Sequence, residues 1–498
     1  MLNYDVIVIG AGNGGLTAAA TMAKNGNKVL LLERHNVPGG CATSFCRGRF
    51  EFETALHQLS AFGSEDHPGP LRRQLEELGI VHKIDWVPMK NLYRVALPEQ
   101  NLDITLPSDI SEIIAVLQKR FPEESEQIVK FFGLISRWVR EMSMVMKYKG
   151  EATREKYPLY FKYALKSYQE VLDEFFTDSL LKLTLGVYWC YAGVPPTGWT
   201  FTNAAPTLYG YFEFLPYHMI GGSQALSNAL IDVFLESGGK VRFNCAARKI
   251  LVNNNHVSGV LLETGEIIDT GFVISNASSV DTYIELIDRQ NVPNHQLEIL
   301  GGSKVGTSAF NLYLGLDCEP SELGITESTN FLCSSTDMER AYRQSKYIEP
   351  NPDMLLLTCY DAMDCNFSQK GTSQVAVICM SYSDPWEKIP PQQYYETKCR
   401  MADQILNIVE KHFPGIRAHI EEIEIATPLT YMRYLGTPGG AIYGFEQFTK
   451  DTNYFVSPRS PIEGLYLAGA WAGSGGFQPT LQSGIEAGKA VIRELKNR

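Results

Sequence analysis

The sequence predicts an α/β protein in which two structural regions are interleaved along the chain. Its first 33 residues alternate strand, glycine turn, helix and strand, which is typical of a parallel sheet covered by helices. The same alternation returns near residue 221 and again in the last 40 residues, with helical and aromatic-rich stretches between them. The chain has 498 residues, whereas single hydrophobic cores stop growing near ~250–300 residues. We therefore expect two domains that are discontinuous in sequence.

The N-terminal unit has the clearest pattern. Residues 4–9 (YDVIVI) form a short apolar run of the kind that a buried parallel strand shows. Residues 16–24 predict a helix, which a glycine and an asparagine then interrupt. Residues 28–33 (KVLLLE) predict a second strand that ends in an acid.

The remaining elements follow in order. Amphipathic helices are predicted over 108–120 and 124–147, before an aromatic belt at residues 157–214. A helix is predicted over 223–236, and short β-rich runs alternate from residue 305 onward. Further helices are predicted near 391–412 and from about Leu481 to Lys496.

Composition limits the choice of partners. The chain carries 56 acidic and 44 basic residues, for a formal net charge of −12. An acidic surface repels a phosphate backbone, so we expect no nucleic acid and a neutral or apolar substrate. The ten cysteines form no Cys-x-x-Cys pair, so no metal is expected. No basic region of a signal peptide and no apolar span of ~18 residues is present, so we expect a cytoplasmic protein with membrane association left open.

A glycine-rich turn follows the first strand and opens the first helix. The first glycine of G-x-G-x-x-G permits a tight turn, the second lets a pyrophosphate approach the backbone, and the third lets helix and strand pack closely. The free amides and positive end of that helix would bind phosphate. The cofactor-binding residues expected from this turn are Gly10, Gly12, Asn13, Gly14 and Gly15.

The next segment favours FAD as the dinucleotide. Glu33 ends the second strand, where it would accept hydrogen bonds from a ribose and repel a 2′-phosphate. Gly39 and Gly40 follow closely and would allow a second approach of the backbone to a diphosphate, which favours FAD over NAD. Arg34, beside the acid, is included in the expected site.

As a set, the motifs resemble one family of flavoproteins. The glycine turn, Glu33, the Gly-Gly doublet, residues 216–226 (PYHMIGGSQAL) and the C-terminal GLYLAGAW…GG…QSGIEAG are similar to the phytoene desaturase, carotenoid isomerase and retinol saturase family. That family lies within the amine-oxidase-like flavoproteins. Residues 50–57 are similar to the saturase pattern F-[DE]-x-G-x-H, but Ala55 stands where that pattern has glycine.

The resemblance implies further cofactor contacts and a domain division. Ala247 would lie against adenine, and the helix after residues 473–476 would direct its positive end at the flavin. The contacts implied for the ribityl chain and pyrimidine edge are Gly469, Ala470, Pro479, Thr480, Leu481 and Gln482. We assign residues 1–75, 216–290 and 455–498 to a Rossmann-like FAD-binding domain, and 76–215 and 291–454 to an α+β substrate-binding domain.

The implied activity is that of an FAD-dependent oxidoreductase. It would add, remove or rearrange hydrogen across C–C bonds of a long lipophilic conjugated substrate (carotenoid-, retinoid- or polyene-like) by hydride exchange with flavin N5. His57 and Glu446 are the candidates for any catalytic proton transfer. No second G-x-G-x-x-G follows a strand, so an external electron donor or acceptor is expected: a quinone, oxygen or a reduced carrier.

The aromatic belt has two interpretations. It could line an apolar tunnel for a lipid, or its side chains could be ordinary core. The basic residues that accompany it indicate either a membrane-contacting surface or a solvated face. They are Lys147, Lys149, Arg154, Lys156, Lys162 and Lys166.

Two other functions remain open. An amine oxidase would remove hydride from a C–N bond, but that class usually has arginine after the Gly-Gly doublet, where this chain has Cys41. A non-enzymatic prenyl-binding carrier on the same fold, like the Rab escort and GDP-dissociation-inhibitor proteins, departs from the flavin fingerprint that this chain keeps.

Overall fold

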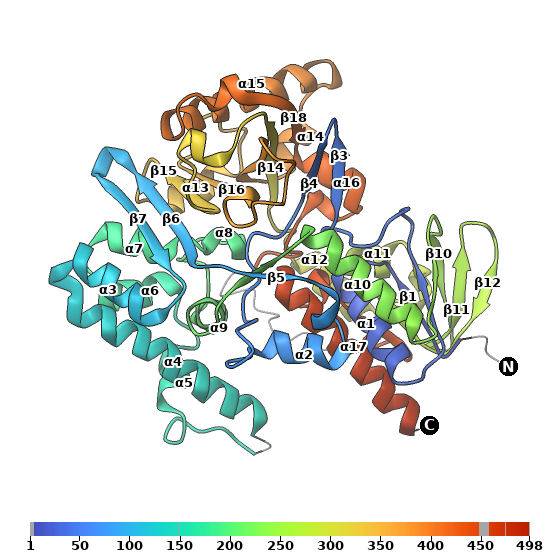
Figure 1. Ribbon diagram of the computed structural model, residues 1–498. Helices are drawn as coiled ribbons and strands as arrows, with labels where there is room; N and C mark the ends of the chain where they lie inside the picture. Colours follow the sequence, from blue (N-terminus) through green and yellow to red (C-terminus); the bar gives the residue numbers. More distant parts are fainter. Residues whose placement is uncertain (1–3, 149, 448–457, 474, 498) are drawn as a thin grey trace.

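A computed structural model describes residues 4–148, 150–447, 458–473 and 475–497 (Figure 1). The domain boundary expected at residue 455 lies outside these ranges. No helix in them is both long and apolar enough to cross a bilayer.

A parallel sheet of five strands lies at the end of the molecule where both termini are found (Figure 1). Its order is β19 (Leu465–Leu467), β13 (Val273–Ser275), β1 (Val6–Ile9), β2 (Val29–Leu32) and β9 (Lys240–Arg242). The central strand β1 pairs with β2 on one side and β13 on the other, and all its residues are buried, as its apolar sequence predicts. Three segments far apart in sequence thus build one sheet, which confirms the predicted α/β class.

Three helices share one hydrophobic core with this sheet: α1 (Asn13–Lys24), α10 (Gly222–Glu236) and α17 (Phe477–Asn497). Helices α1 and α17 approach closely because Gly484 has no side chain, and a Cβ there would collide with the carbonyl oxygen of Gly14. An antiparallel sheet of β10 (Ala247–Asn253), β11 (His256–Leu262) and β12 (Ile267–Asp269) lies beside the parallel one.

A mixed sheet of seven strands forms the second layer. Its order is β18 (Ile420–Ala426), β14 (Ser308–Leu316), β17 (Ser373–Ser381), β16 (Met354–Cys359), β15 (Thr329–Cys333), β6 (Asn91–Leu97) and β7 (Leu102–Pro107). All pairs are antiparallel except β15–β6. Helix α15 (Pro391–His412), whose bounds match the prediction, packs on it through a second core.

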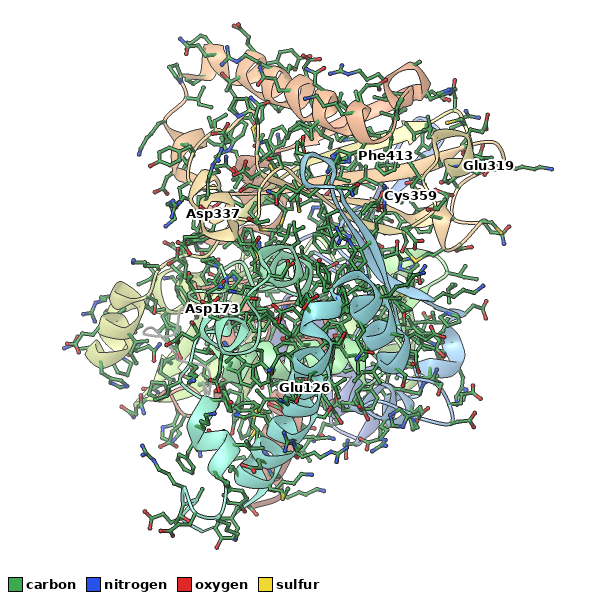
Figure 2. All side chains as sticks on the ribbon, turned by 90° about the vertical axis from the view of Figure 1, so that its left-hand side faces the viewer. Glu126, Asp173, Glu319, Asp337, Cys359 and Phe413 are labelled. Carbon is green, nitrogen blue, oxygen red and sulfur yellow. The ribbon has the colours of Figure 1, made fainter. Side chains whose placement is uncertain are left out.

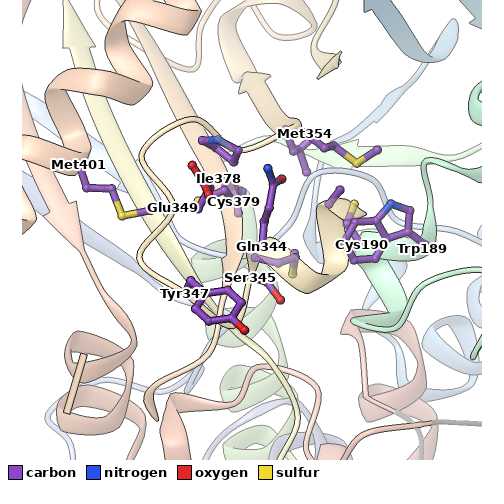
Figure 3. Close-up of a pocket in the computed structure, with 14 residues that line it drawn as sticks. Trp189, Cys190, Gln344, Ser345, Tyr347, Glu349, Met354, Ile378, Cys379 and Met401 are labelled. Carbon is purple, nitrogen blue, oxygen red and sulfur yellow. The ribbon is translucent and has the colours of Figure 1, made fainter. Parts of the chain in front are cut away.

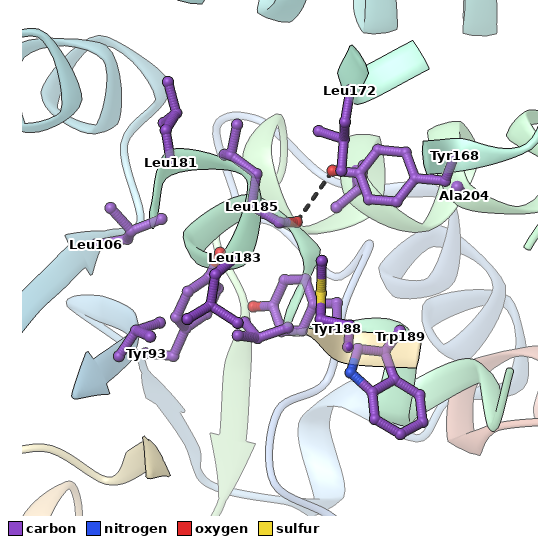
Figure 4. Close-up of a cluster of buried hydrophobic side chains, with 14 of the residues drawn as sticks. Tyr93, Leu106, Tyr168, Leu172, Leu181, Leu183, Leu185, Tyr188, Trp189 and Ala204 are labelled. Atoms are coloured by element: carbon purple, nitrogen blue, oxygen red, sulfur yellow. Dashed lines mark hydrogen bonds between the residues drawn. The ribbon is translucent and has the colours of Figure 1, made fainter. Parts of the chain in front are cut away.

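A helical layer lies beyond β6 and β7. It includes α3 (Ile110–Arg120), α4 (Ser125–Lys147), α6 (Tyr168–Phe175), α7 (Ser179–Gly186), α8 (Trp189–Ala192) and α9 (Phe201–Phe212). Most of the aromatic belt is buried in its core (Figure 4). There the Tyr168 hydroxyl donates to the Leu185 carbonyl at 3.0 Å. Of the two interpretations of the belt, ordinary core therefore accounts for most of its residues. In a side view, Asp173 and Glu126 lie in this layer, below Phe413 and Glu319 of the seven-stranded layer (Figure 2).

The other elements are short. The remaining helices are α2 (Pro70–Leu78), α5 (Pro158–Tyr163), α11 (Ser279–Ile284), α12 (Asn294–Gly302), α13 (Met338–Gln344), α14 (Asp384–Glu387) and α16 (Pro428–Leu435). Two strand pairs join β3 (Ser44–Arg47) to β4 (Phe50–Glu53), and β5 (Trp86–Pro88) to β8 (Tyr217–Met219). The last helix begins at Phe477, not near Leu481, because Pro479 fits in a first turn whose N–H groups have no intrahelical partner.

Candidate functional site

The glycine turn brings the N-terminus of α1 to the carboxyl edge of the parallel sheet. Gly10 has a φ of +90°, which only glycine adopts without strain. A Cβ on Gly15 would collide with the carbonyl oxygen of Gly10. Gly12 is the N-cap residue and provides no capping side chain, so the first-turn amides of α1 remain available to an anion.

The second glycine pair packs against the first. The amide of Gly39 donates to the carbonyl of Ala11 at 2.7 Å. Glu33 accepts from the Ala11 amide at 2.6 Å and the His35 amide at 2.8 Å, so its carboxylate is held beside the turn. A Cβ on Gly40 would stand 3.2 Å from the Cα of Gly12. The acid and both glycine segments therefore meet at one place, as their predicted roles require.

Ala247 and Arg34 flank this place. The amides of Asn244 and Cys245 donate to the carbonyls of His35 and Glu33, each at 2.9 Å. Ala247, two residues after Cys245, is the first residue of β10. Arg34 is exposed and donates to the carbonyl of Tyr434 at 3.2 Å, so its guanidinium is turned toward α16.

Asn276 lies against the glycine turn and was not predicted from the sequence. Its amide donates to the carbonyl of Ile9 at 2.8 Å, directly after β13. A Cβ on Gly12 would come within 2.8 Å of Asn276 Nδ2, and one on Gly14 within 2.6 Å of Asn276 Oδ1. A polar residue directly after a predicted parallel strand was the available signal, because such positions face the ligand crevice.

Residues from 469 to 482 also lie against the glycine turn, and we call the group of segments that meet there the cradle. Gly469, with a φ of +87°, lies so close to α1 that a Cβ on Gly14 would come within 2.6 Å of its nitrogen. Ala470 follows in a short 3₁₀ turn. The predicted contact residues Pro479, Thr480, Leu481 and Gln482 all lie in the first two turns of α17.

Helix α17 is tied to α1 at this end. Thr17 Oγ1 donates to the carbonyl of Leu481 at 2.9 Å, and Asn13 Nδ2 donates to Thr480 Oγ1 at 3.5 Å. The buried Oδ1 of Asn13 has no hydrogen-bond partner among the described residues. Within the loop expected at 473–476, residue 474 lies outside the described part of the chain.

The doublet Gly221–Gly222, which precedes the body of α10, has a different role from Gly39–Gly40. Gly222 begins α10, and the buried carboxylate of Glu53 accepts from the Ser223 amide at 2.5 Å and the Ser223 hydroxyl at 2.7 Å. The amides of Ala55 and Leu56 also donate to Glu53. Burial raises the pKa of the Glu53 carboxyl although these donors act in the opposite direction. An internal acid therefore occupies the N-terminus of α10.

His57 lies between strand β16 and helix α8. Its Nδ1 shares a hydrogen bond with Thr358 Oγ1 of β16 at 2.7 Å, and its ring stacks on Tyr191 with centroids 6.0 Å apart. Burial lowers the pKa of His57 to about 4, because an imidazolium would lose its hydration there. The imidazole is thus neutral near pH 7.

Four side chains, Cys41 and three tyrosines, are enclosed by protein yet keep accessible surface. The Cys41 side chain is accessible, although burial raises the pKa of its thiol to about 11. The side chains of Tyr191, Tyr431 and Tyr443 are likewise partly accessible, and burial raises the pKa of each hydroxyl. A side chain that is enclosed yet accessible borders an internal space, and because Tyr191 stacks on His57 we infer that a mainly aromatic hollow lies beside this histidine.

His218 was also missed by the sequence analysis. It lies on β8 with no exposed surface, and neither ring nitrogen has a hydrogen-bond partner within the described ranges. Burial, together with the neighbouring His57, lowers the pKa of His218 to about 3. Its ring packs against Tyr360 at 5.6 Å between centroids. The family-like segment 216–226 contains this histidine, but no role was assigned to it from the sequence.

Glu446, the second candidate for proton transfer, is bonded to two tyrosine side chains. Its Oε1 accepts from the Tyr382 hydroxyl at 2.7 Å and the Tyr342 hydroxyl at 3.2 Å. The pKa values of both hydroxyls are raised, by burial first and by the Glu446 charge second for Tyr382. Two tyrosine hydroxyls thus donate to the carboxylate that is the second candidate for proton transfer.

A separate cavity lies between α8, α13 and strands β16 and β17 (Figure 3). Trp189, Cys190, Gln344 and Met354 are among its lining residues. Its volume of about 20 Å³ is comparable with one water molecule, so it cannot hold a dinucleotide or a lipid.

The parallel sheet, the glycine turn and the acid after β2 define a dinucleotide-binding protein of the Rossmann-like class. Residues 8–76 match the family model described as an NAD(P)-binding Rossmann-like domain.

The curated relatives extend over almost the whole chain. All-trans-retinol 13,14-reductase from Danio rerio is 25% identical, covering 98% of this chain and 86% of the relative. Prolycopene isomerase from Daucus carota is 24% identical, covering 94% and 76%. These matches confirm the predicted resemblance.

Among solved structures, putrescine oxidase has the same fold, with a TM-score of 0.65, 15% identity and 99% of each chain covered. The predicted fold class, a Rossmann-like domain with a second α+β region, is thereby confirmed.

Proposed function

We propose that this protein is an FAD-dependent oxidoreductase that adds, removes or rearranges hydrogen across C–C bonds of a long, lipophilic, conjugated substrate. The observation that carries the proposal is the cradle at α1, where Gly10–Gly15, Gly39–Gly40, Asn276 and Gly469 meet. Relatives named as a retinol reductase and a prolycopene isomerase support the substrate class.

The residues present fit FAD. The first-turn amides of α1 would hold the pyrophosphate, and Glu33 would accept from the adenosine ribose. Asn13 Oδ1, buried without a partner among the described residues, would accept from a hydroxyl of the cofactor. Ala247 would lie beside adenine, and residues 479–482 beside the ribityl chain. Bound FAD would supply two-electron redox chemistry at the hollow beside His57.

His57 is better placed than Glu446 to act on a substrate. It is joined to the aromatic hollow through its stack on Tyr191, whereas the Glu446 carboxylate is bonded to two tyrosine hydroxyls. A neutral imidazole can accept a proton or orient a polar group there. The enclosing aromatic side chains would exclude water and hold a conjugated chain in position.

Two measurements test this proposal. Purified protein should show absorption bands near ~375 and ~450 nm from bound flavin. Anaerobic mixing with polyenes, and separately with amines, should bleach or restore the flavin colour only with polyenes. Mass spectrometry of the product should then show whether the substrate has gained two hydrogens, lost two hydrogens or kept its mass. A colourless folded protein would contradict the proposal that the protein binds a flavin. Bleaching by amines alone would favour an amine oxidase.

The electron partner is proposed to be external. Among the described residues a single β–glycine–α–β unit has the arrangement that would hold a dinucleotide, and we assign it to FAD. A quinone, oxygen or a reduced carrier would then exchange electrons with the flavin. Stopped-flow reoxidation of the reduced flavin by a quinone or by oxygen, and reduction of the oxidised flavin by a reduced carrier, should show one reaction that is faster than the others by more than about tenfold.

A further inference from the structure

The end of α4 and helix α5 project from the helical layer away from both sheets (Figure 1). Five large apolar side chains are exposed there, and we call them the α4–α5 tip. They are Met144, Met146, Tyr148, Phe161 and Leu165. Leu165 is 81% exposed and Met146 59%, although an apolar side chain of this size normally gains by burial. Phe161 is an exposed member of the aromatic belt, most of which is buried.

The tip is basic on an acidic protein. Residues 142–166 contain six basic and two acidic residues, whereas the whole chain has a net charge of −12. Lys162 and Lys166 are paired with Glu174 at 2.8 and 2.5 Å, so their charges are partly compensated. Lys147, Arg154 and Lys156 are exposed, and Lys156 Nζ lies 3.7 Å from the centre of the Tyr148 ring.

We infer that the α4–α5 tip docks on a lipid bilayer that contains anionic headgroups. Its apolar side chains would enter the boundary between headgroups and acyl chains, and the three exposed cations would contact lipid phosphates. This inference rests on the proposed function in one respect: a long lipophilic substrate dissolves in a bilayer, so docking gives the enzyme access to it.

Vesicle sedimentation of the FAD-loaded full chain tests the docking. The wild type should sediment with phosphatidylcholine vesicles that contain phosphatidylserine, and less with phosphatidylcholine alone. The double variant M146D/L165D should lose about tenfold or more in partitioning, because two apolar contacts become charged. The variant R154E/K156E should lose a similar factor only with the anionic vesicles.

A matched control is available at the opposite end of the molecule. Tyr395 on α15 is 72% exposed, and Y395D should bind vesicles like the wild type. Equal binding of M146D/L165D and the wild type would overturn the inference, as would a wild type that stays in the supernatant with anionic vesicles. Sedimentation needs no turnover, so failure of the proposed reaction with a detergent-dissolved polyene would be seen separately.

Discussion

Helices α1 and α10 both have a glycine N-cap and share one core with the same sheet, but their N-termini have different partners. At α1 the nearby acid, Glu33, bonds the Ala11 amide in the preceding turn and leaves the first helical amides available. At α10 the nearby acid, Glu53, bonds the Ser223 amide and hydroxyl of the helix itself. A positive helix end attracts an anion in both places, but only at α1 can that anion be a ligand. The position of one carboxylate decides the difference.

The largest effect should come from filling the α1 turn. In G15A the new methyl group meets the Gly10 carbonyl, so the helix must move away from β1. We expect flavin affinity to fall by about 100-fold or more, since the phosphate contacts depend on that approach. Flavin content after gel filtration and fluorescence titration of the apoprotein measure it.

Helix α4 offers the control for this substitution. A Cβ on Gly133 meets nothing within 4 Å, and the residue lies inside the helix. G133A should keep its flavin and gain up to ~1 kcal/mol of stability. If G15A also kept full flavin affinity, the turn would not be the phosphate site.

The α10 end should respond in stability and not in cofactor binding. E53A leaves the Ser223, Ala55 and Leu56 donors buried without their acceptor. We expect a loss of about 2–4 kcal/mol in the free energy of unfolding. The flavin affinity of the fraction that folds should stay within about threefold of wild type. Urea unfolding and flavin titration separate the two quantities, and a flavin loss as large as that of G15A would show that both helix ends serve the cofactor.

The same comparison explains which parts could be predicted from sequence. The α1 site depends on residues 10–33, which are local, so their spacing alone indicated the turn, the helix and the acid. Glu53 depends on Ser223, and Asn276 on the turn at Gly12; these pairs come together only after the sheet has formed. Helix bounds such as 391–412 followed from periodicity, whereas the start of α17 was misplaced because Pro479 suggests an interruption.

The buried His218 and the partly buried His57 should make the region around β8 and β16 sensitive to acid. The pKa of His218 is lowered to about 3 and that of His57 to about 4, while an unfolded imidazole titrates near ~6.5. Because the unfolded chain binds more protons as pH falls below ~6.5, stability is complete above that pH and is lost toward pH 4. Each histidine should contribute up to ~1.4 kcal/mol per pH unit.

H218F isolates one of these contributions. Phenylalanine fits the aromatic contacts with Tyr360 and Phe367 and cannot bind a proton. The free energy of unfolding of H218F should therefore fall less steeply between pH 6.5 and pH 4 than that of the wild type. Above pH 7 the two proteins should show the same dependence of this free energy on pH. Parallel slopes across the whole range would mean that His218 keeps an ordinary proton affinity in the folded protein.

The smallest effect should come from Glu446. The substitution E446Q keeps an oxygen for the Tyr342 and Tyr382 hydroxyls but removes the charge, so we expect a stability loss of only about 1 kcal/mol. Turnover of a polyene should change by less than about threefold, because the carboxylate is bound to tyrosines and not directed at the aromatic hollow. Y382F should give a similar small loss, since it removes the shorter of the two hydrogen bonds. A drop in kcat of about 100-fold in E446Q with unchanged unfolding would instead give Glu446 the proton-transfer role and make its tyrosine partners positioning residues.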